Sequence, residues 1–211
     1  YASIIKKIAP ALKEGMIVTD VGSVKRAVIS KIMRYLPIGV HFVPGHPVAG
    51  TEHSGPESGF ADLFAGRHCI LTPEAGCNTV AIERVRGFWQ HAGMEVEIMD
   101  ADHHDRVLAM TSHLPHLIAY TIVATVGDLE EQLKRETDKN NTLVRTKEVI
   151  RYSAGGFRDF TRIASSDPEM WRDVFLNNRE AILEMLGRFS EDLTALQRAI
   201  RWGDGETLES L

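Results

Sequence analysis

The pattern of apolar residues changes near residue 100. Before it, short apolar segments typical of strands alternate with segments whose apolar residues recur at helical spacing. The predicted strands are Met16–Ser23 (which runs into a turn), Val40–Pro44, His68–Leu71 and Met94–Met99, and the last of these alternates as an edge strand does. After Asp100 no segment has a strand pattern. The sequence therefore predicts an α/β part over residues 1–100, built from βα units of a parallel sheet, and an all-α part over residues 101–211.

Helical spacing predicts the remaining elements. The predicted helices are Ala2–Leu12, Val24–Leu36, Cys77–Ala92, Asp102–Val126, Leu143–Tyr152 and Met170–Trp202, with a break in the last at Asn177-Asn178. Long apolar helices in a chain of 211 residues have few partners within it. We therefore expect a homodimer formed through the C-terminal helices. The alternative is packing within one chain.

Composition limits the classes of partner. The net charge of −5 argues against a nucleic-acid partner, which requires a basic surface. The two cysteines form no disulfide framework, so we expect free thiols in a reducing, cytoplasmic compartment. No charged-then-apolar leader opens the chain, and the most apolar run, Leu117–Val126, is too short to span a bilayer. We therefore expect no membrane partner.

Polar residues follow the first predicted strand. Asp20, Gly22 and Ser23 lie at its carboxyl end, where open α/β sheets bind their ligands. Asp20 is expected to cap the turn and Ser23 to cap the next helix. Contact with a ligand is the second role that this place in a sheet indicates.

His46 follows the second predicted strand, between Gly45 and Pro47 on a stiff turn. Histidine is the side chain most readily poised for proton transfer near neutral pH. A lone histidine is usually a surface or core residue, but this location on a rigid scaffold favours a functional one.

Pro115 interrupts the helix predicted over Asp102–Val126 and should kink it. Ser112 and His116 are four residues apart beside the kink and share a helix face, which suggests a site. The neighbouring histidines match no established zinc spacing, so we expect no metal. Adjacency of Ser112 and His113 is no evidence for a hydrolytic triad, which is recognised by geometry.

A charged segment starts at the double glycine Gly155-Gly156 and is predicted to be a loop. It carries Arg158, Asp159 and Arg162, and an arginine there could hold a carboxylate in a bidentate fork. Asp167 is predicted to cap the helix that follows. The alternative is an ordinary solvated loop with surface ion pairs.

Four motifs occur in a fixed order. They are Asp20-Val21-Gly22-Ser23-Val24-Lys25, Gly45-His46-Pro47-x-x-Gly50-Thr51, Ser112-His113-Leu114-Pro115-His116, and Gly155-Gly156-Phe157-Arg158-Asp159-x-x-Arg162 followed by Ser166-Asp167-Pro168-x-x-Trp171. Each is weak alone, but together they resemble the prephenate dehydrogenase family, which includes arogenate and cyclohexadienyl dehydrogenases. The resemblance covers nearly the whole chain. It implies an oxidoreductase of tyrosine biosynthesis that transfers hydride to NAD or NADP.

The resemblance also implies roles for individual residues. His46 accepts the proton or hydrogen bond of the substrate ring hydroxyl, and Ser23 supports it. Asp20, Gly22, Ser23 and Ser112 lie near the cofactor. Substrate contacts are assigned to Arg162 as a carboxylate clamp, His116, Thr51, Glu52, Arg158 and Asp159, with Glu52 pairing with an arginine as a gate. The resemblance further implies the C-terminal part of a Rossmann-like domain, followed by a helical dimerisation domain.

One departure from the family is large. The family begins with a βαβ unit carrying G-x-G-x-x-G, and none of the 17 glycines here makes that pattern. We expect position 1 to lie inside the family's first domain, so that this chain alone binds a dinucleotide weakly. The alternative is a non-catalytic dimerisation or binding remnant. A β-hydroxyacid dehydrogenase is disfavoured, because residues 112–116 contain no lysine.

Overall fold

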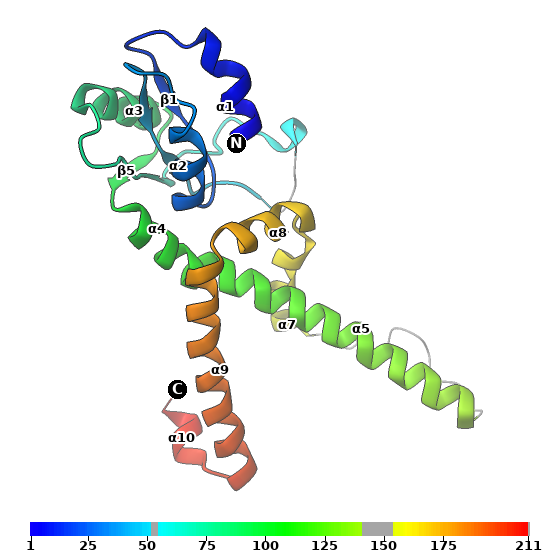
Figure 1. Ribbon diagram of the computed structural model, residues 1–211. Coiled ribbons are helices and arrows are strands. Elements are labelled where there is room, and N and C mark those ends of the chain that lie inside the picture. Colours follow the sequence, from blue (N-terminus) through cyan, green and yellow to red (C-terminus); the bar gives the residue numbers. More distant parts are fainter. Residues whose placement is uncertain (52–54, 141–153, 211) are drawn as a thin grey trace. The chain divides into compact units, whose positions relative to one another are not determined.

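The computed structural model describes residues 1–51, 55–140 and 154–210. Figure 1 traces the chain from the N-terminus to the C-terminus. The described residues divide into two compact units. The first contains Tyr1–Ala49, Phe64–Leu114 and Asp173–Leu211, and the second contains Gly50–Leu63 and Pro115–Arg172. Each unit is built from segments that are distant in the sequence.

The first unit contains the strands. β1 (Ile17–Thr19) pairs in parallel with β2 (His41–Val43), and β3 (Gly45–Pro47), β4 (His68–Leu71) and β5 (Glu95–Ile98) form a second ladder. β4 and β5 are parallel, with β5 at the edge as predicted, whereas β3 and β4 are antiparallel. The parallel pairing predicted for the first strand is confirmed, and the antiparallel β3–β4 pair is an addition that the sequence did not indicate. The prediction of a turn at His46 was wrong, because His46 lies in β3.

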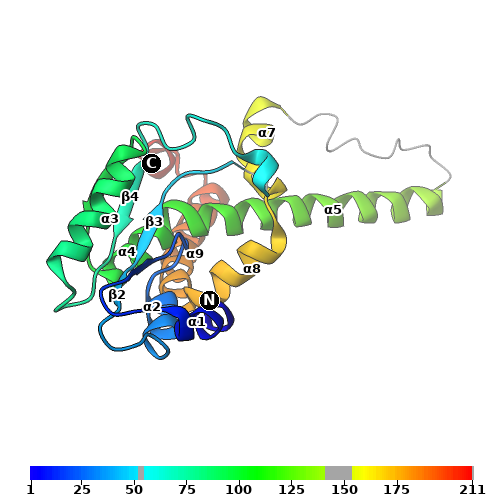
Figure 2. The same cartoon turned by 90° about the horizontal axis from the view of Figure 1, so that it is seen from above.

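Helices pack on both sides of these strands (Figures 1 and 2). They are α1 (Ala2–Ile8) with the 3₁₀ turn η1 (Ala9–Ala11), α2 (Arg26–Met33) and α3 (Thr79–His91). The side chain of Asn78 caps α3 by accepting a hydrogen bond from the Ala81 N–H. α2 buries Val28, Ile29 and Ile32, so its apolar spacing is used as predicted.

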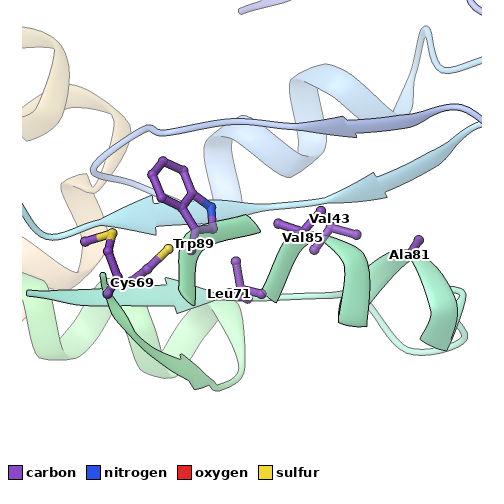
Figure 3. Packing of buried hydrophobic residues seen from close by; sticks show 7 residues of the cluster. Val43, Cys69, Leu71, Ala81, Val85 and Trp89 are labelled. Carbon is purple, nitrogen blue, oxygen red and sulfur yellow. The ribbon is translucent and has the colours of Figure 1, made fainter. Parts of the chain in front are cut away.

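One apolar cluster joins α3 to the strands (Figure 3). Its fully or nearly fully buried members are Val43, Cys69, Leu71, Ala81, Val85, Trp89 and Met94. Because β2 and β4 both contribute to this cluster, packing against α3 holds the two ladders together. Both cysteines are free thiols.

The helical part begins with α4 (Ala101–Leu108), a π-helical turn η3 (Ala109–His113) and α5 (Leu114–Asn140). Pro115 lies in the first turn of α5, just after the π turn, in which the Leu114 N–H donates to the Ala109 carbonyl. Since proline has no N–H and its ring crowds the carbonyl four residues earlier, the widened turn accommodates it. The predicted helix is thus divided at this point.

The second unit contains most of α5, the 3₁₀ turn η2 (Pro56–Ser58), α7 (Gly155–Thr161), the 3₁₀ segment η4 (Arg162–Ser165) and the start of α8 (Pro168–Asn177). The charged segment predicted as a loop is therefore mostly helical. The Asp167 carboxylate accepts hydrogen bonds from the N–H groups of Glu169 and Met170, which confirms the predicted cap.

The chain continues in the first unit with α9 (Arg179–Trp202) and the short α10 (Gly205–Glu209). α8 ends at Asn177 and α9 begins at Arg179, so the predicted break is confirmed. Every element described after residue 100 is helical. The helix predicted over Leu143–Tyr152 lies outside the described residues.

Among the residues that the structure describes, one helical run, Ala101–Gln132, is long and apolar enough to cross a membrane by length and composition alone, with 28% of its most apolar window buried. It includes Leu117–Val126, which the sequence suggested was too short to span. The core helix of a soluble protein passes the same test, so one such run is weak evidence of a membrane span.

Candidate active site

A buried ion pair organises the loop between β1 and α2. The Lys25 ammonium is fully buried and lies 2.6 Å from the Asp20 carboxylate. Lys25 also donates to the Gly45 carbonyl, and Asp20 accepts from the N–H groups of Gly22 and Gly45. A Cβ at Gly45 would lie 3.0 Å from the Asp20 carbonyl, so glycine permits this close approach. Asp20 therefore caps the turn as predicted.

The carboxylate of Asp105, on α4, caps the N-terminus of α2. Its Oδ1 accepts from the Lys25 N–H at 2.8 Å, and its Oδ2 accepts from the Arg26 N–H at 3.0 Å. A carboxylate is favourable here because the first N–H groups of a helix have no partner within it. The prediction that Ser23 caps this helix was wrong, since an acidic side chain from a distant helix does so.

His46 is the first member of a chain of three side chains. His46 Nδ1 lies 2.8 Å from His104 Nε2, and His104 Nδ1 lies 2.8 Å from Asp105 Oδ1. The two imidazole rings meet edge to face, with an interplanar angle of 69°. His46 is 7% exposed and His104 is 0% exposed. Such short contacts between buried polar groups fix the orientation of each ring.

Asn178 connects these three hydrogen-bonded side chains to the π turn. Its Nδ2 donates to the Asp105 carbonyl at 2.7 Å and lies 3.1 Å from His113 Nδ1. Asn178 lies at the junction of α8 and α9, and all three residues are buried. The junction thereby holds α4 and the π turn in register.

Burial is the main cause that lowers the pKa of His46, from its ordinary value of 6.5 to about 3. The positive charges that His104, Lys25 and His113 can carry lower it further, in that order. Burial also lowers the pKa of Lys25, while Asp20 opposes this effect by favouring the charged ammonium. His46 is thus held as a neutral imidazole.

The free energy of unfolding should fall as the pH falls below about 6.5. The unfolded chain binds a proton at His46 before the folded chain does, so the stability from this group is complete above pH 6.5 and is lost towards pH 3. His46 should contribute a slope of about 1.4 kcal/mol per pH unit within this window. Urea unfolding at several pH values should show a smaller slope for His46→Gln. His91→Gln, at an exposed histidine of α3, should keep the wild-type slope, and equal slopes for all three proteins would contradict the assignment.

The sequence-predicted residues fall into two groups. Asp20 and Gly22 meet beside Lys25 in the first unit, and His46 directly follows Gly45, whose carbonyl accepts from Lys25. Two further predicted residues of this unit, Ser23 and Ser112, are half-buried, the latter in the π turn.

The other predicted residues belong to the second unit. Arg158 and Asp159 lie on α7 and Arg162 starts η4, all with exposed side chains. His116 stacks on the buried Trp171, with ring centroids 3.6 Å apart. Thr51 is exposed, and Glu52 lies outside the described residues.

Sequence reasoning missed Lys25, His104, Asp105 and Asn178 as parts of the site. A lysine is rarely buried, so no pattern marks Lys25 as internal. The adjacent His104-Asp105 pair at the start of a helix was the only available signal. Within the part of the chain that the structure describes, no group of three or more potential ligands is arranged to hold a metal ion.

A cavity of about 690 Å³ lies next to this network in the first unit, but His46 does not line it. Asp105 and Asn178 line it together with charged residues of α4 and α9. Its charges are paired, as in the contact of 2.8 Å between Arg26 and Asp102. This cavity is separate from the His46 side chain.

The strands with flanking helices, followed by helical segments, define a class of protein. Proteins of this class have a Rossmann-like α/β part followed by a helical part. Residues 1–98 match the nucleotide-binding domain of prephenate dehydrogenase, and residues 100–211 match its dimerisation domain. The chain belongs to the prephenate dehydrogenase family.

Individual relatives agree with this assignment. The chain is 43% identical to a cyclohexadienyl dehydrogenase of Zymomonas mobilis over 95% of its length, and 32% identical to a prephenate dehydrogenase of Bacillus subtilis over 93%. It spans 64% and 50% of the lengths of these two relatives.

Solved structures show the same fold. A prephenate dehydrogenase from A. aeolicus, in complex with hydroxyphenyl propionate and NAD⁺, superposes with a TM-score of 0.83 at 36% identity, over all of this chain and 68% of the other. Synechocystis arogenate dehydrogenase, at 24% identity, has a TM-score of 0.73 over 96% of this chain and 68% of the other.

Proposed function

We propose that the intact protein oxidatively decarboxylates prephenate or arogenate, with hydride transfer to NAD or NADP, in tyrosine biosynthesis. The products are 4-hydroxyphenylpyruvate or tyrosine, respectively, together with carbon dioxide. One observation carries the proposal. In a chain of this family, His46 is buried and neutral, and its Nδ1 contacts a second histidine. This contact leaves Nε2 as the nitrogen that can accept from a reacting hydroxyl.

The chemistry requires little from the protein beyond placement. Loss of hydride from the ring carbon and loss of the ring carboxylate give an aromatic ring, and aromatisation drives the reaction. The protein must orient the ring, accept the hydroxyl proton and bind the side-chain carboxylate. We assign the proton to His46 with Ser23 in support, and the carboxylate to Arg162. His116, Thr51, Glu52, Arg158 and Asp159 are proposed to border the substrate.

A nicotinamide dinucleotide would supply the hydride acceptor. Gly22 and Ser23 follow a strand at its carboxyl end, which is where such sheets bind nucleotides, and Ser112 is the proposed contact from the helical part. Both oxygens of Asp20 already accept hydrogen bonds from within the chain. Asp20 therefore fits the cofactor site as the residue that shapes the loop rather than as a direct contact.

The decisive experiment is a spectrophotometric assay of the intact protein. Prephenate and arogenate are each supplied with NAD⁺ or NADP⁺, and formation of the reduced nicotinamide is followed by absorbance. Turnover with one substrate and one cofactor supports the proposal. An intact, folded protein that binds no dinucleotide and turns over neither substrate would instead be the non-catalytic remnant.

We also propose a homodimer through the C-terminal helices. Leu193 and Ile200 lie seven residues apart on one face of α9 and are 48% and 67% exposed, which fits an interface. Leu193→Asp should raise the dimer dissociation constant about tenfold or more, because it buries an unpaired charge. Sedimentation velocity measures the change.

Ala195→Asp provides the matched control for the dimer, because this exposed residue lies on the opposite face of the same helix. It should sediment as the wild type does. A wild-type protein that remains monomeric at high concentration would rule out the homodimer.

A further inference from the structure

The unexplained feature of the site is the second histidine behind His46. His104 is completely buried, touches no solvent and uses both ring nitrogens, one towards His46 and one towards Asp105. A buried polar side chain is costly unless its hydrogen bonds are made, so this arrangement constrains where each proton lies.

The constraint starts at Asp105. Backbone N–H groups can only donate, and the Lys25 and Arg26 N–H groups point at its two carboxylate oxygens. Asp105 is thereby stabilised as an acceptor. His104 Nδ1, which is 2.8 Å from the same carboxylate, must carry the hydrogen of that contact.

The remaining protons follow in order. A neutral His104 with its hydrogen on Nδ1 has a lone pair on Nε2, so His46 Nδ1 must donate to it across 2.8 Å. A neutral His46 with its hydrogen on Nδ1 has its lone pair on Nε2. We propose that His104 and Asp105 are positioning residues that fix His46 in this tautomer and take over the proton that His46 accepts.

The proposed transfer balances. The O–H bond of the substrate hydroxyl breaks as a bond to His46 Nε2 forms. The Nδ1–H bond of His46 breaks as a bond to His104 Nε2 forms. The positive charge then lies on His104, next to the Asp105 carboxylate, and His46 is neutral again. No oxidant enters this step, because the hydride leaves separately to the nicotinamide.

The transfer resolves a difficulty of the site. A base works best when its pKa lies near the operating pH, and burial holds the pKa of His46 at about 3. Lys25 and His113 also disfavour a positive charge on His46, whereas Asp105 lies directly against His104. A proton passed to His104 therefore reaches a carboxylate that stabilises it.

The tautomer can be tested without activity. In the intact protein labelled with ¹⁵N-histidine, NMR shifts distinguish a ring that carries its hydrogen on Nδ1 from one that carries it on Nε2. The His46 signal, identified by its loss in His46→Asn, should show the Nδ1–H form near neutral pH. An Nε2–H form would overturn the proposal.

The transfer is tested by variants, and this part rests on the proposed function. His104→Gln places an amide where Nε2 was, so it can still accept from His46 but cannot take a proton. It should keep the His46 tautomer and lower kcat about tenfold or more, with KM changed less than about threefold. His104→Phe removes the acceptor, so the Nδ1–H preference should disappear.

The matched control is His103→Gln, at the exposed neighbour on the same helix, which should keep kcat within about twofold of wild type. An unchanged kcat in His104→Gln would overturn the transfer step. His104→Gln tests this step by itself, so the test stands even if His104→Phe does not fold. A wild-type protein without dehydrogenase activity would refute the proposed function, while the NMR result would still decide the tautomer.

Discussion

His46→Asn in the intact protein should lower kcat by about 10²–10⁴-fold, which is the usual contribution of a general base. Asparagine is close to histidine in size and polarity, and its amide can still form hydrogen bonds, but it cannot accept a proton at neutral pH. Substrate binding should therefore change little, with KM within about threefold of wild type. Initial rates over a range of substrate concentrations separate the two parameters.

The control for this prediction is His103→Asn, which makes the same chemical change at an exposed position of α4. It should have wild-type kinetics. A His46→Asn protein that is folded, keeps the wild-type kcat and binds substrate poorly would show that His46 binds substrate and is not the base.

Arg162→Gln should raise KM for the substrate by about 10–150-fold, because hydrogen bonds to charged groups contribute about 1.5–3 kcal/mol. The proposed contact is to the side-chain carboxylate, which does not change its charge in the reaction. The interaction should therefore be equal in the ground state and the transition state, so kcat should stay within about threefold of wild type.

Two further variants sharpen the test of Arg162. Arg162→Lys should recover only part of the affinity, since an ammonium lacks the planar fork that holds a carboxylate with two parallel hydrogen bonds. Arg188→Gln, which removes an exposed arginine of α9 paired with Glu184, should leave KM unchanged. A loss confined to kcat in Arg162→Gln would count against a carboxylate clamp.

Much of the fold could be predicted from local sequence. The loss of strand patterns after Asp100, the cap at Asp167 and the break at Asn177-Asn178 all appear in the structure. Two predictions of local structure were wrong. The His46 turn became strand β3 because Gly45–Pro47 pairs with Cys69–Leu71, and the charged loop after Gly155 became α7. The β3 strand depends on a partner more than 20 residues away in the sequence.

The candidate site was predicted in part. The sequence marked Asp20, Gly22 and His46 because each follows a predicted strand. In the structure Asp20 binds both Gly22 and Lys25, and His46 is connected to Lys25 through His104 and Asp105. The sequence did not mark Lys25 as buried, since its ammonium is stabilised inside the protein by distant partners, the Asp20 carboxylate at 2.6 Å and the Gly45 carbonyl.

The sequence alone determined most of the strands and helices and where several helices begin, because spacing and caps act over a few residues. The tertiary structure alone decided which distant residues form hydrogen bonds with one another. Asp105 caps a helix from 80 residues away, and His104 meets His46 across 58 residues. These contacts depend on how strands and helices pack, and a hydrogen bond requires a placement within a few tenths of an ångström that no local pattern encodes.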